Sequence, residues 1–423
     1  MERIERRKFL KFAFATGAAL PFAARAGDAP KARVVVVGGG FGGAAAAKYL
    51  RLLDPGLEVT LITREREFAA CPMSNEVLIG ERDLKEQVFN HTALTRYGVQ
   101  VLYGDAEAVD PVKKHVTLHE GRQFPYDKLV LAPGIDFVWN AVEGFNEDGA
   151  AIMPHAYKGA VQMLLLKGQI EAMRDGGLVV IVVPPRPIRC PPAPYERAAL
   201  IAHYLKRHKP RSKVIVVDAN DSYPMQKWFD KEWARHYGPM ITWVSASAGG
   251  RVERVDMLGR TIYTEFENYS GDVVNFIPRQ RAGAIAVRAG VTDASGFCPV
   301  NPESLESLHH KDVYIVGDSA RIPNMAKTAH GAVSHAKVVA GAIAATVNGQ
   351  PRPVPYYTSV GYALITPEYA FSGTQVLKVI NGEIEMVKDA GGPSPFNAPD
   401  HERAAEATMA KSWYRNLTAD AFL

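Results

Sequence analysis

Short apolar runs along the chain alternate with segments of helical periodicity, and the first run is Val34–Val37. It leads into the glycine-rich turn Gly38–Gly43, after which an alanine-rich helix is predicted from Ala44 to Leu53. A strand that ends in G-x-G-x-x-G before a helix is typical of dinucleotide-binding folds, in which the helix N-terminus faces a pyrophosphate. An ordinary strand–turn–helix packing motif is the alternative interpretation.

The glycines of this motif have different expected roles. Gly38 permits the tight turn, Gly40 lets the backbone approach a pyrophosphate, and Gly43 lets the helix pack closely on the strand. Beyond the next strand, Glu65 is a candidate ribose ligand, although Thr63 stands where the acidic residue of such folds usually falls.

A second signature lies far along the chain. An apolar strand ends in Gly317-Asp318 and precedes a helix predicted over 328–347. In FAD proteins of this class the aspartate accepts a hydrogen bond from a ribityl hydroxyl, and the helix directs its N-terminal amides at the flavin. Lys327 and His330 stand at the helix start, where each is either a flavin contact or a solvated or capping side chain. The two signatures together predict FAD.

Between the signatures, the strand from Tyr126 ends at Pro133-Gly134, and Gly134 is counted in the predicted cofactor site. A second Rossmann-like unit follows, with helix, strand, helix and strand predicted over 157–174, 178–183, 195–208 and 214–217. Its turn, Pro184–Pro192, carries prolines where a nicotinamide site would carry glycines. Because proline has no N–H, this turn is not expected to cradle a pyrophosphate, and NAD(P)H is not expected as a partner. A rigid surface loop is the plain alternative.

The predicted fold is α/β, with two Rossmann-like domains and a C-terminal α+β interface domain. The expected divisions are a signal segment at 1–26, the two halves of an FAD domain at 30–150 and 276–348, the second Rossmann-like domain at 151–275 and the interface domain at 349–423.

The first 26 residues have the features of an export signal. Arg6-Arg7 lies in a basic leader, an apolar run covers 12–24, and small residues at Ala24 and Ala26 frame a cleavage site. The run is shorter than the roughly 20 residues that span a bilayer, so no integral membrane segment is expected in the mature chain. These features predict twin-arginine (Tat) export to the periplasm, with a general secretory signal as the alternative.

Charge and cysteine content narrow the function classes. The leader holds six basic and two acidic residues and so accounts for the whole formal charge of +4, which gives no support for nucleic-acid binding by the mature chain. The three cysteines, Cys71, Cys190 and Cys298, form neither a CxxCH haem attachment nor a CxxC motif, and no HExxH motif is present. Neither haem nor a catalytic metal is therefore expected on this chain.

Four segments carry a resemblance to a known family. They are Phe68–Val77, Arg189–Arg197, Gly296–Val300 and Ile315–Asp318, and the similarity continues to the Ser412-Trp413-Tyr414 ending. The chain resembles the flavoprotein subunit of flavocytochrome c sulfide dehydrogenase, a family of glutathione-reductase-like flavoproteins. The resemblance implies a periplasmic enzyme that oxidises sulfide to sulfur and passes electrons to a separate haem-bearing c-type cytochrome subunit.

The resemblance also implies roles for individual residues. Cys71 matches the residue that holds FAD through a thioether to the 8α-methyl carbon, with a plain buried thiol as the alternative. Cys190 matches one half of a redox-active disulfide, and Arg186 and Arg189 are expected to favour its thiolate and attract HS⁻. Glu196 matches a carboxylate that acts as acid or base near that sulfur.

One position departs from the family pattern. The partner half-cystine aligns with Gly361, so the familiar disulfide of Cys190 is not expected. Cys298 can replace it only if the fold brings the two Cα atoms within about 7 Å. The alternatives are therefore a flavoprotein dehydrogenase for another small reductant, or a non-catalytic flavin-bearing subunit that binds sulfur compounds.

Overall fold

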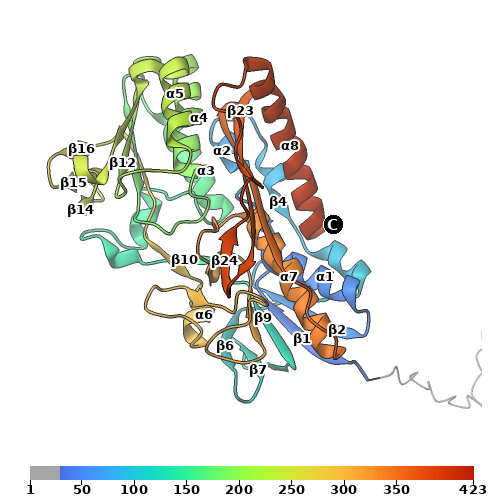
Figure 1. Ribbon diagram of the computed structural model, residues 1–423. Helices are drawn as coiled ribbons and strands as arrows, with labels where there is room; N and C mark the ends of the chain where they lie inside the picture. Colours follow the sequence, from blue (N-terminus) through green and yellow to red (C-terminus); the bar gives the residue numbers. More distant parts are fainter. Residues whose placement is uncertain (1–28) are drawn as a thin grey trace, which may run out of the picture.

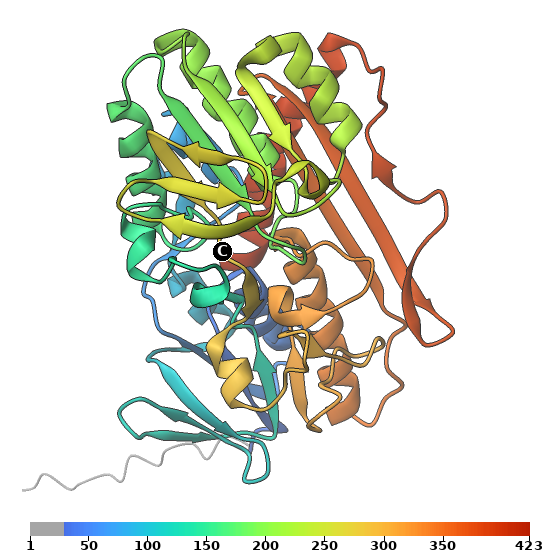
Figure 2. The same cartoon turned by 90° about the vertical axis from the view of Figure 1, so that its left-hand side faces the viewer.

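A computed structural model describes residues 29–423, so the predicted signal at 1–26 lies outside the described residues. The chain forms two parallel α/β layers and an antiparallel C-terminal sheet that runs alongside both (Figures 1 and 2). This arrangement confirms the predicted fold class.

The first layer is a five-stranded parallel sheet in the order β20-β9-β1-β2-β5. Its strands are β1 (Ala32–Val37), β2 (Leu57–Thr63), β5 (Gln100–Tyr103), β9 (Lys128–Leu131) and β20 (Val313–Ile315), and helices α1 (Phe41–Leu53) and α7 (Ala329–Val347) pack together against it. Strand β20 comes from the far part of the chain and lies beside β9, with Val313 opposite Leu129. The two glycine signatures therefore follow two strands of one sheet, β1 and β20, which are separated by β9 alone, and they lie at the edge where α/β folds bind ligands.

The second layer has the strand order β13-β12-β11-β17, also parallel. It contains β11 (Leu178–Val183), β12 (Lys213–Asp218), β13 (Ile241–Val244), β17 (Val273–Phe276), α3 (Ala160–Ala172), α4 (Ala193–His208) and α5 (Gln226–Tyr237), with β14 (Val252–Asp256), β15 (Thr261–Thr264) and β16 (Asn268–Ser270) as a separate sheet. The first helix begins later than predicted, because Gly159 adopts a φ of +81° immediately before it. The second begins two residues earlier, since prolines are tolerated in a first helical turn.

The remaining short elements connect these layers. They are β3 (Phe68–Ala69), α2 (Ser74–Leu78), β4 (Val88–Phe89), β6 (Ala106–Asp110), β7 (His115–Leu118), β8 (Gln123–Pro125), β10 (Ile135–Phe137), β18 (Gln280–Ala282), α6 (Ala284–Arg288), β19 (Cys298–Pro299) and β21 (Ala320–Arg321).

The C-terminal region contains a long hairpin and a long helix. It consists of β22 (Tyr356–Thr366), β23 (Tyr369–Ile380), β24 (Glu383–Met386), β25 (Gly392–Pro393) and α8 (Asp400–Phe422). Side chains alternate across β22: Ala363 and Ile365 belong to the apolar cluster of α4, whereas Leu364 belongs to the cluster of the first layer. The strand therefore contacts both layers, and Gly361 lies on its α4 face.

Within the described residues, no helix combines the length and apolar character needed to cross a membrane. The same part of the chain holds no cluster of three or more histidine, cysteine or carboxylate side chains arranged to bind a metal ion.

Candidate functional site

A cavity of about 1050 Å³ opens between the first and second layers. Its first-layer walls include Gly38, Gly40, Glu65, Cys71, Gly134, Gly317 and Asp318, and its second-layer walls include Trp139, His155, Tyr157, Lys158 and Arg189. Most of the residues predicted to bind a cofactor thus share one space. Gly43 and Lys327 do not line it.

The glycine turn has the geometry of a phosphate cradle. Gly38 has a φ of +107°, and a Cβ there would lie 2.3 Å from the carbonyl oxygen of Ala132. At Gly43 a Cβ would lie 1.8 Å from the carbonyl oxygen of Gly38, so this residue allows the close packing of α1 on β1 even though it is outside the cavity. Gly40 precedes the first turn of α1, whose amides face the cavity. The predicted roles of Gly38 and Gly43 agree with this geometry, and that of Gly40 stays a prediction.

Asp318 stands at the end of β20 with an unused acceptor. Its Oδ1 atom is buried and has no hydrogen-bond partner among the described residues, and burial raises the pKa of this carboxyl. A buried polar atom without a partner is costly, so this oxygen fits a bound hydroxyl such as that of a ribityl chain. The cavity, the cradle and this acceptor together fit FAD.

Lys327 braces the turn that carries Asp318. Its Nζ donates to the carbonyl oxygens of Asp318 and Ala320, at 2.8 and 2.7 Å, and burial lowers the pKa of the ammonium to about 8. Thr328, one residue on, caps α7 by accepting a hydrogen bond from the Gly331 amide at 2.9 Å. Lys327 therefore holds the Asp318 turn from behind the cavity wall.

Cys71 lines the cavity, and Cys190 follows Arg189, which also lines it. Both thiols are half-buried and unpaired. Burial raises the pKa of each, the charge of Arg189 opposes this, and a negative charge on Cys71 raises the pKa of Cys190 further. Burial thus opposes the thiolate that the arginines are expected to favour at Cys190.

Only one of the two arginines expected to favour a thiolate at Cys190 has an electrostatic effect on that thiol. Arg186 turns its guanidinium to the carbonyl oxygen of Ser222 and to Asn220, on the exposed side of the proline turn. Of the two arginines, Arg189 alone acts electrostatically on Cys190, and burial outweighs its effect on the pKa of the thiol. The backbone of Cys190 is itself constrained: φ is +49°, and its amide donates to the carbonyl oxygen of Lys327 at 2.6 Å.

Glu196 stands in the first turn of α4, and its carboxylate accepts hydrogen bonds from two distant segments. Oε1 accepts from the Leu364 amide of β22 at 3.0 Å, and Oε2 accepts from Asn75 Nδ2 at 2.7 Å. Burial raises the pKa of Glu196 to about 7, although both hydrogen bonds oppose the shift. A carboxyl poised near neutral pH is suited to acid–base work.

Cys298 forms no disulfide with Cys190, since both thiols are free. Cys298 is fully buried on β19, where burial raises the pKa of its thiol to about 12. A Cβ added at Gly361, by contrast, would meet no atom within 4 Å. The family's second cysteine therefore has room at the aligned position.

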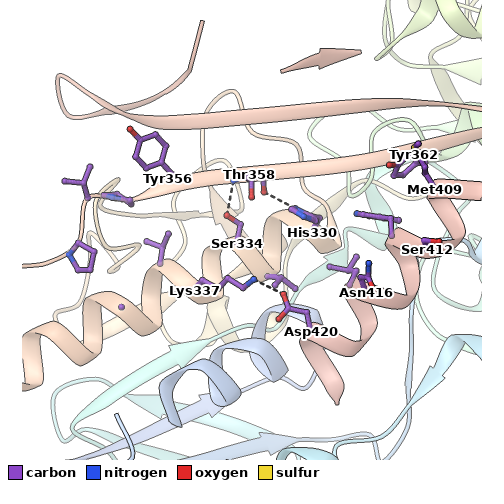
Figure 3. A pocket seen from close by; sticks show the side chains of 18 of the residues that line it. His330, Ser334, Lys337, Tyr356, Thr358, Tyr362, Met409, Ser412, Asn416 and Asp420 are labelled. Carbon is purple, nitrogen blue, oxygen red and sulfur yellow. Dashed lines mark hydrogen bonds and ion pairs between the residues drawn. The ribbon is translucent and has the colours of Figure 1, made fainter. Parts of the chain in front are cut away.

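A second cavity, of about 720 Å³, lies between α7, β22 and α8 (Figure 3). His330 lines this space and not the main cavity, and its Nδ1 lies 3.3 Å from the carbonyl oxygen of Thr358. Tyr362 and Trp413 both line it, with ring centroids 5.7 Å apart, and Lys337 pairs with Asp420 at 2.8 Å.

Four further residues of the main site were not found from the sequence. Arg197 is fully buried and donates to Asn75 Oδ1 at 3.0 Å, which orients the amide that holds Glu196. His155 comes from a segment between predicted elements, and Tyr157 stands at the start of the helix predicted over 157–174. Asn75 and Arg197 fall within the family-like segments, but only the fold shows that they meet.

Family comparisons agree with this geometry. The family described as the central part of the flavoprotein chain of sulfide dehydrogenase (flavocytochrome c) matches residues 163–278, and the flavin-binding part of flavocytochrome c sulphide dehydrogenase matches residues 353–422. Pyridine nucleotide-disulphide oxidoreductase matches residues 32–164. A sulfide dehydrogenase (flavocytochrome c) flavoprotein chain from Chlorobaculum thiosulfatiphilum is 64% identical over 45 residues, 11% of this chain and 94% of that one.

The chain belongs to the flavocytochrome c sulfide dehydrogenase flavoprotein family. It is accordingly an FAD-binding flavoprotein oxidoreductase of the sulfide dehydrogenase and sulfide–quinone reductase type, as the resemblance implied. The sulfide-quinone reductase of Aquifex aeolicus is 25% identical over 70% of both chains. The solved structure of the A. aeolicus sulfide:quinone oxidoreductase shares the fold, with a TM-score of 0.73, 20% identity and 92% of each chain covered.

Proposed function

We propose that this flavoprotein oxidises sulfide, or a related sulfur species, in the periplasm and passes the electrons to a separate c-type cytochrome. The observation that carries the proposal is that Arg189, which lines a cavity that fits FAD, is followed directly by Cys190 and then by Glu196 in the first turn of α4, whose charge acts on the Cys190 thiol. FAD, when bound there, supplies an acceptor for two electrons that can release them one at a time.

The chain's own groups have separate tasks in this proposal. Arg189 attracts an anionic sulfur species into the cavity. Glu196, with a pKa of about 7, takes the proton that the Cys190 thiol or the substrate gives up. Asn75 and the Leu364 amide hold the carboxylate in place for that transfer.

Sulfide as the donor can be tested by mixing the oxidised holoenzyme anaerobically with sulfide. Rapid bleaching of the flavin absorption, followed by haem reduction when a c-type cytochrome is added, is expected. No bleaching by sulfide would contradict the assignment and favour either another small reductant or a non-catalytic sulfur-binding subunit.

A quinone is the second candidate acceptor, and the cavity between α7 and α8 favours it. That cavity has aromatic walls at Tyr362 and Trp413 and is large enough for an aromatic ring. Sulfide-dependent reduction of a soluble quinone analogue, measured beside cytochrome c reduction, separates the two. Faster quinone reduction that Trp413→Ala abolishes would replace the cytochrome proposal.

The covalent link belongs to the same proposal. Cys71 lines the main cavity, where its Sγ is within the site that fits FAD. The mass of the denatured chain should exceed the sequence mass by one FAD, and Cys71→Ser should remove the increment. An unmodified mass for the native chain would leave Cys71 as a buried thiol.

Export by the twin-arginine route rests on residues 1–26. Replacing Arg6 and Arg7 together by lysine should hold the precursor in the cytoplasm, as measured by cell fractionation. Unchanged export of that variant would favour the general secretory route.

A further inference from the structure

The segment Pro154–Tyr157 is strained and tightly held. Ala156 has a φ of +47°, a conformation that a non-glycine residue adopts only when its surroundings impose it. Arg197 donates to the carbonyl oxygens of His155 and Ala156 at 3.1 and 2.8 Å. Asn275 donates to those of Pro154 and His155 at 2.7 and 3.0 Å. Four hydrogen bonds from two buried side chains therefore fix a backbone that projects two side chains toward the main cavity.

His155 is one of these side chains, and its tautomer is set by the backbone. Its Nδ1 accepts a hydrogen bond from the Tyr157 amide at 3.0 Å, so the proton lies on Nε2. The ring is 4% exposed and lines the cavity. Burial and the charges of Arg189, Arg197 and Lys158 lower the pKa of His155 to about 3. The imidazole is therefore neutral and offers an N–H donor to the cavity.

Tyr157 offers a second donor. Its side chain is 6% exposed and lines the same cavity, and its hydroxyl is buried with no hydrogen-bond partner among the described residues. The guanidinium groups of Arg197 and Arg189 lie 5.2 and 5.9 Å from the ring centroid. Cys71 and Arg189, the residue before Cys190, line the same cavity as Tyr157. Such an unpartnered hydroxyl is costly unless a ligand accepts from it.

We propose that Tyr157 Oη–H and His155 Nε2–H, together with the Arg189 guanidinium, form a subsite that receives the anionic end of a sulfur substrate beside Cys190. The proposal rests on the proposed function and adds the residues that position the substrate. Neutral donors beside Arg189 suit a monoanion, because they stabilise negative charge without adding further positive charge to a buried site.

The test uses thiocyanate, a monoanion with a terminal sulfur that does not reduce the flavin. Titrating the oxidised holoenzyme with potassium thiocyanate should perturb the flavin absorption with a saturable dependence on concentration. Tyr157→Phe should weaken binding about tenfold or more, the loss expected for one hydrogen bond to a charged group. His155→Phe should weaken it similarly, whereas His155→Gln, which keeps an N–H donor, should largely restore it.

Tyr126→Phe is the matched control. The Tyr126 hydroxyl is also buried and without a partner among the described residues, but it does not line the cavity, so its removal should leave thiocyanate affinity unchanged. Flavin content is measured for every variant. Loss of FAD from Tyr157→Phe would assign the hydroxyl to the cofactor and overturn the proposal, as would wild-type affinity in both phenylalanine variants. Because this titration uses no sulfide, a failure of the subsite proposal can be distinguished from a failure of the proposed sulfide oxidation.

Discussion

The units β1–α1 and β11–α4 have the same strand–turn–helix topology, yet their turns serve different chemistry. In the first, glycines bring backbone amides to the cavity, and a Cβ at Gly38 or Gly43 would collide with carbonyl oxygens. In the second, prolines remove the amides, and the turn instead carries Cys190 with Glu196 in the helix that follows. The same position in a Rossmann-like unit thus holds a phosphate cradle in one layer and a thiol with a proton acceptor in the other.

A substitution that disrupts the first turn should have the largest effect on stability and on FAD content. Gly43→Ala places a methyl group 1.8 Å from the Gly38 carbonyl oxygen, so α1 must move away from β1. We expect a loss of about 4 kcal/mol or more of unfolding free energy and no retained FAD, measured by thermal unfolding and flavin absorbance. Pro185→Ala, at an exposed position of the second turn, should change stability by about 1 kcal/mol or less. Equal losses of unfolding free energy in the two variants would contradict the difference described between the two turns.

Breaking the second turn should abolish chemistry and spare the cofactor. Cys190→Ser should lower sulfide-dependent turnover by about a hundredfold or more while flavin content stays the same. Cys298→Ala is the control, because that thiol is fully buried away from the cavity lining, and it should retain turnover. Turnover at the wild-type rate in Cys190→Ser would remove the thiol from the mechanism.

The carboxyl beside Cys190 gives a pH test of the same turn. With a pKa of about 7, Glu196 is protonated below neutral pH and gains its function as a base as the pH rises through that value. Turnover should rise across this range, and Glu196→Gln should lower it by about 10²- to 10⁴-fold and remove the enzyme's contribution to the rise. The ionisation of sulfide itself persists in the variant and serves as the internal reference. An unchanged profile would exclude Glu196 as the base.

Restoring the family's second cysteine should have the mildest effect on the fold. Gly361 lies on the α4 face of β22, and a Cβ there meets no atom within 4 Å. Gly361→Cys should form a disulfide with Cys190 after oxidation with little change in stability. Peptide mapping after alkylation should show both thiols protected, and a Cys190 that still alkylates would show that the aligned position does not face it.

The sequence predicted what local geometry or a motif encodes. The roles of Gly38 and Gly43 follow from the turn itself, and Cys71, Cys190 and Glu196 followed from family-like segments that the fold brings to one region. By contrast, the pairing of Asn75 with Arg197 joins residues 122 positions apart, and no periodicity reports such a contact. The apolar pattern places the site residue Tyr157 at the start of a helix, whereas α3 begins at Ala160. Gly159 delays the start through its backbone conformation, which leaves the apolar pattern unchanged.

The two tethers of Glu196 have a consequence for how activity arises during folding. One comes from Asn75 in α2 and the other from the backbone of β22, and the carboxyl itself belongs to α4 of the second layer. In an unfolded chain the same group titrates near 4.3. Only when the three segments have come together does the carboxyl acquire a pKa of about 7, which suits a base that handles sulfide. An incompletely folded chain therefore holds an ordinary surface carboxylate and lacks this base.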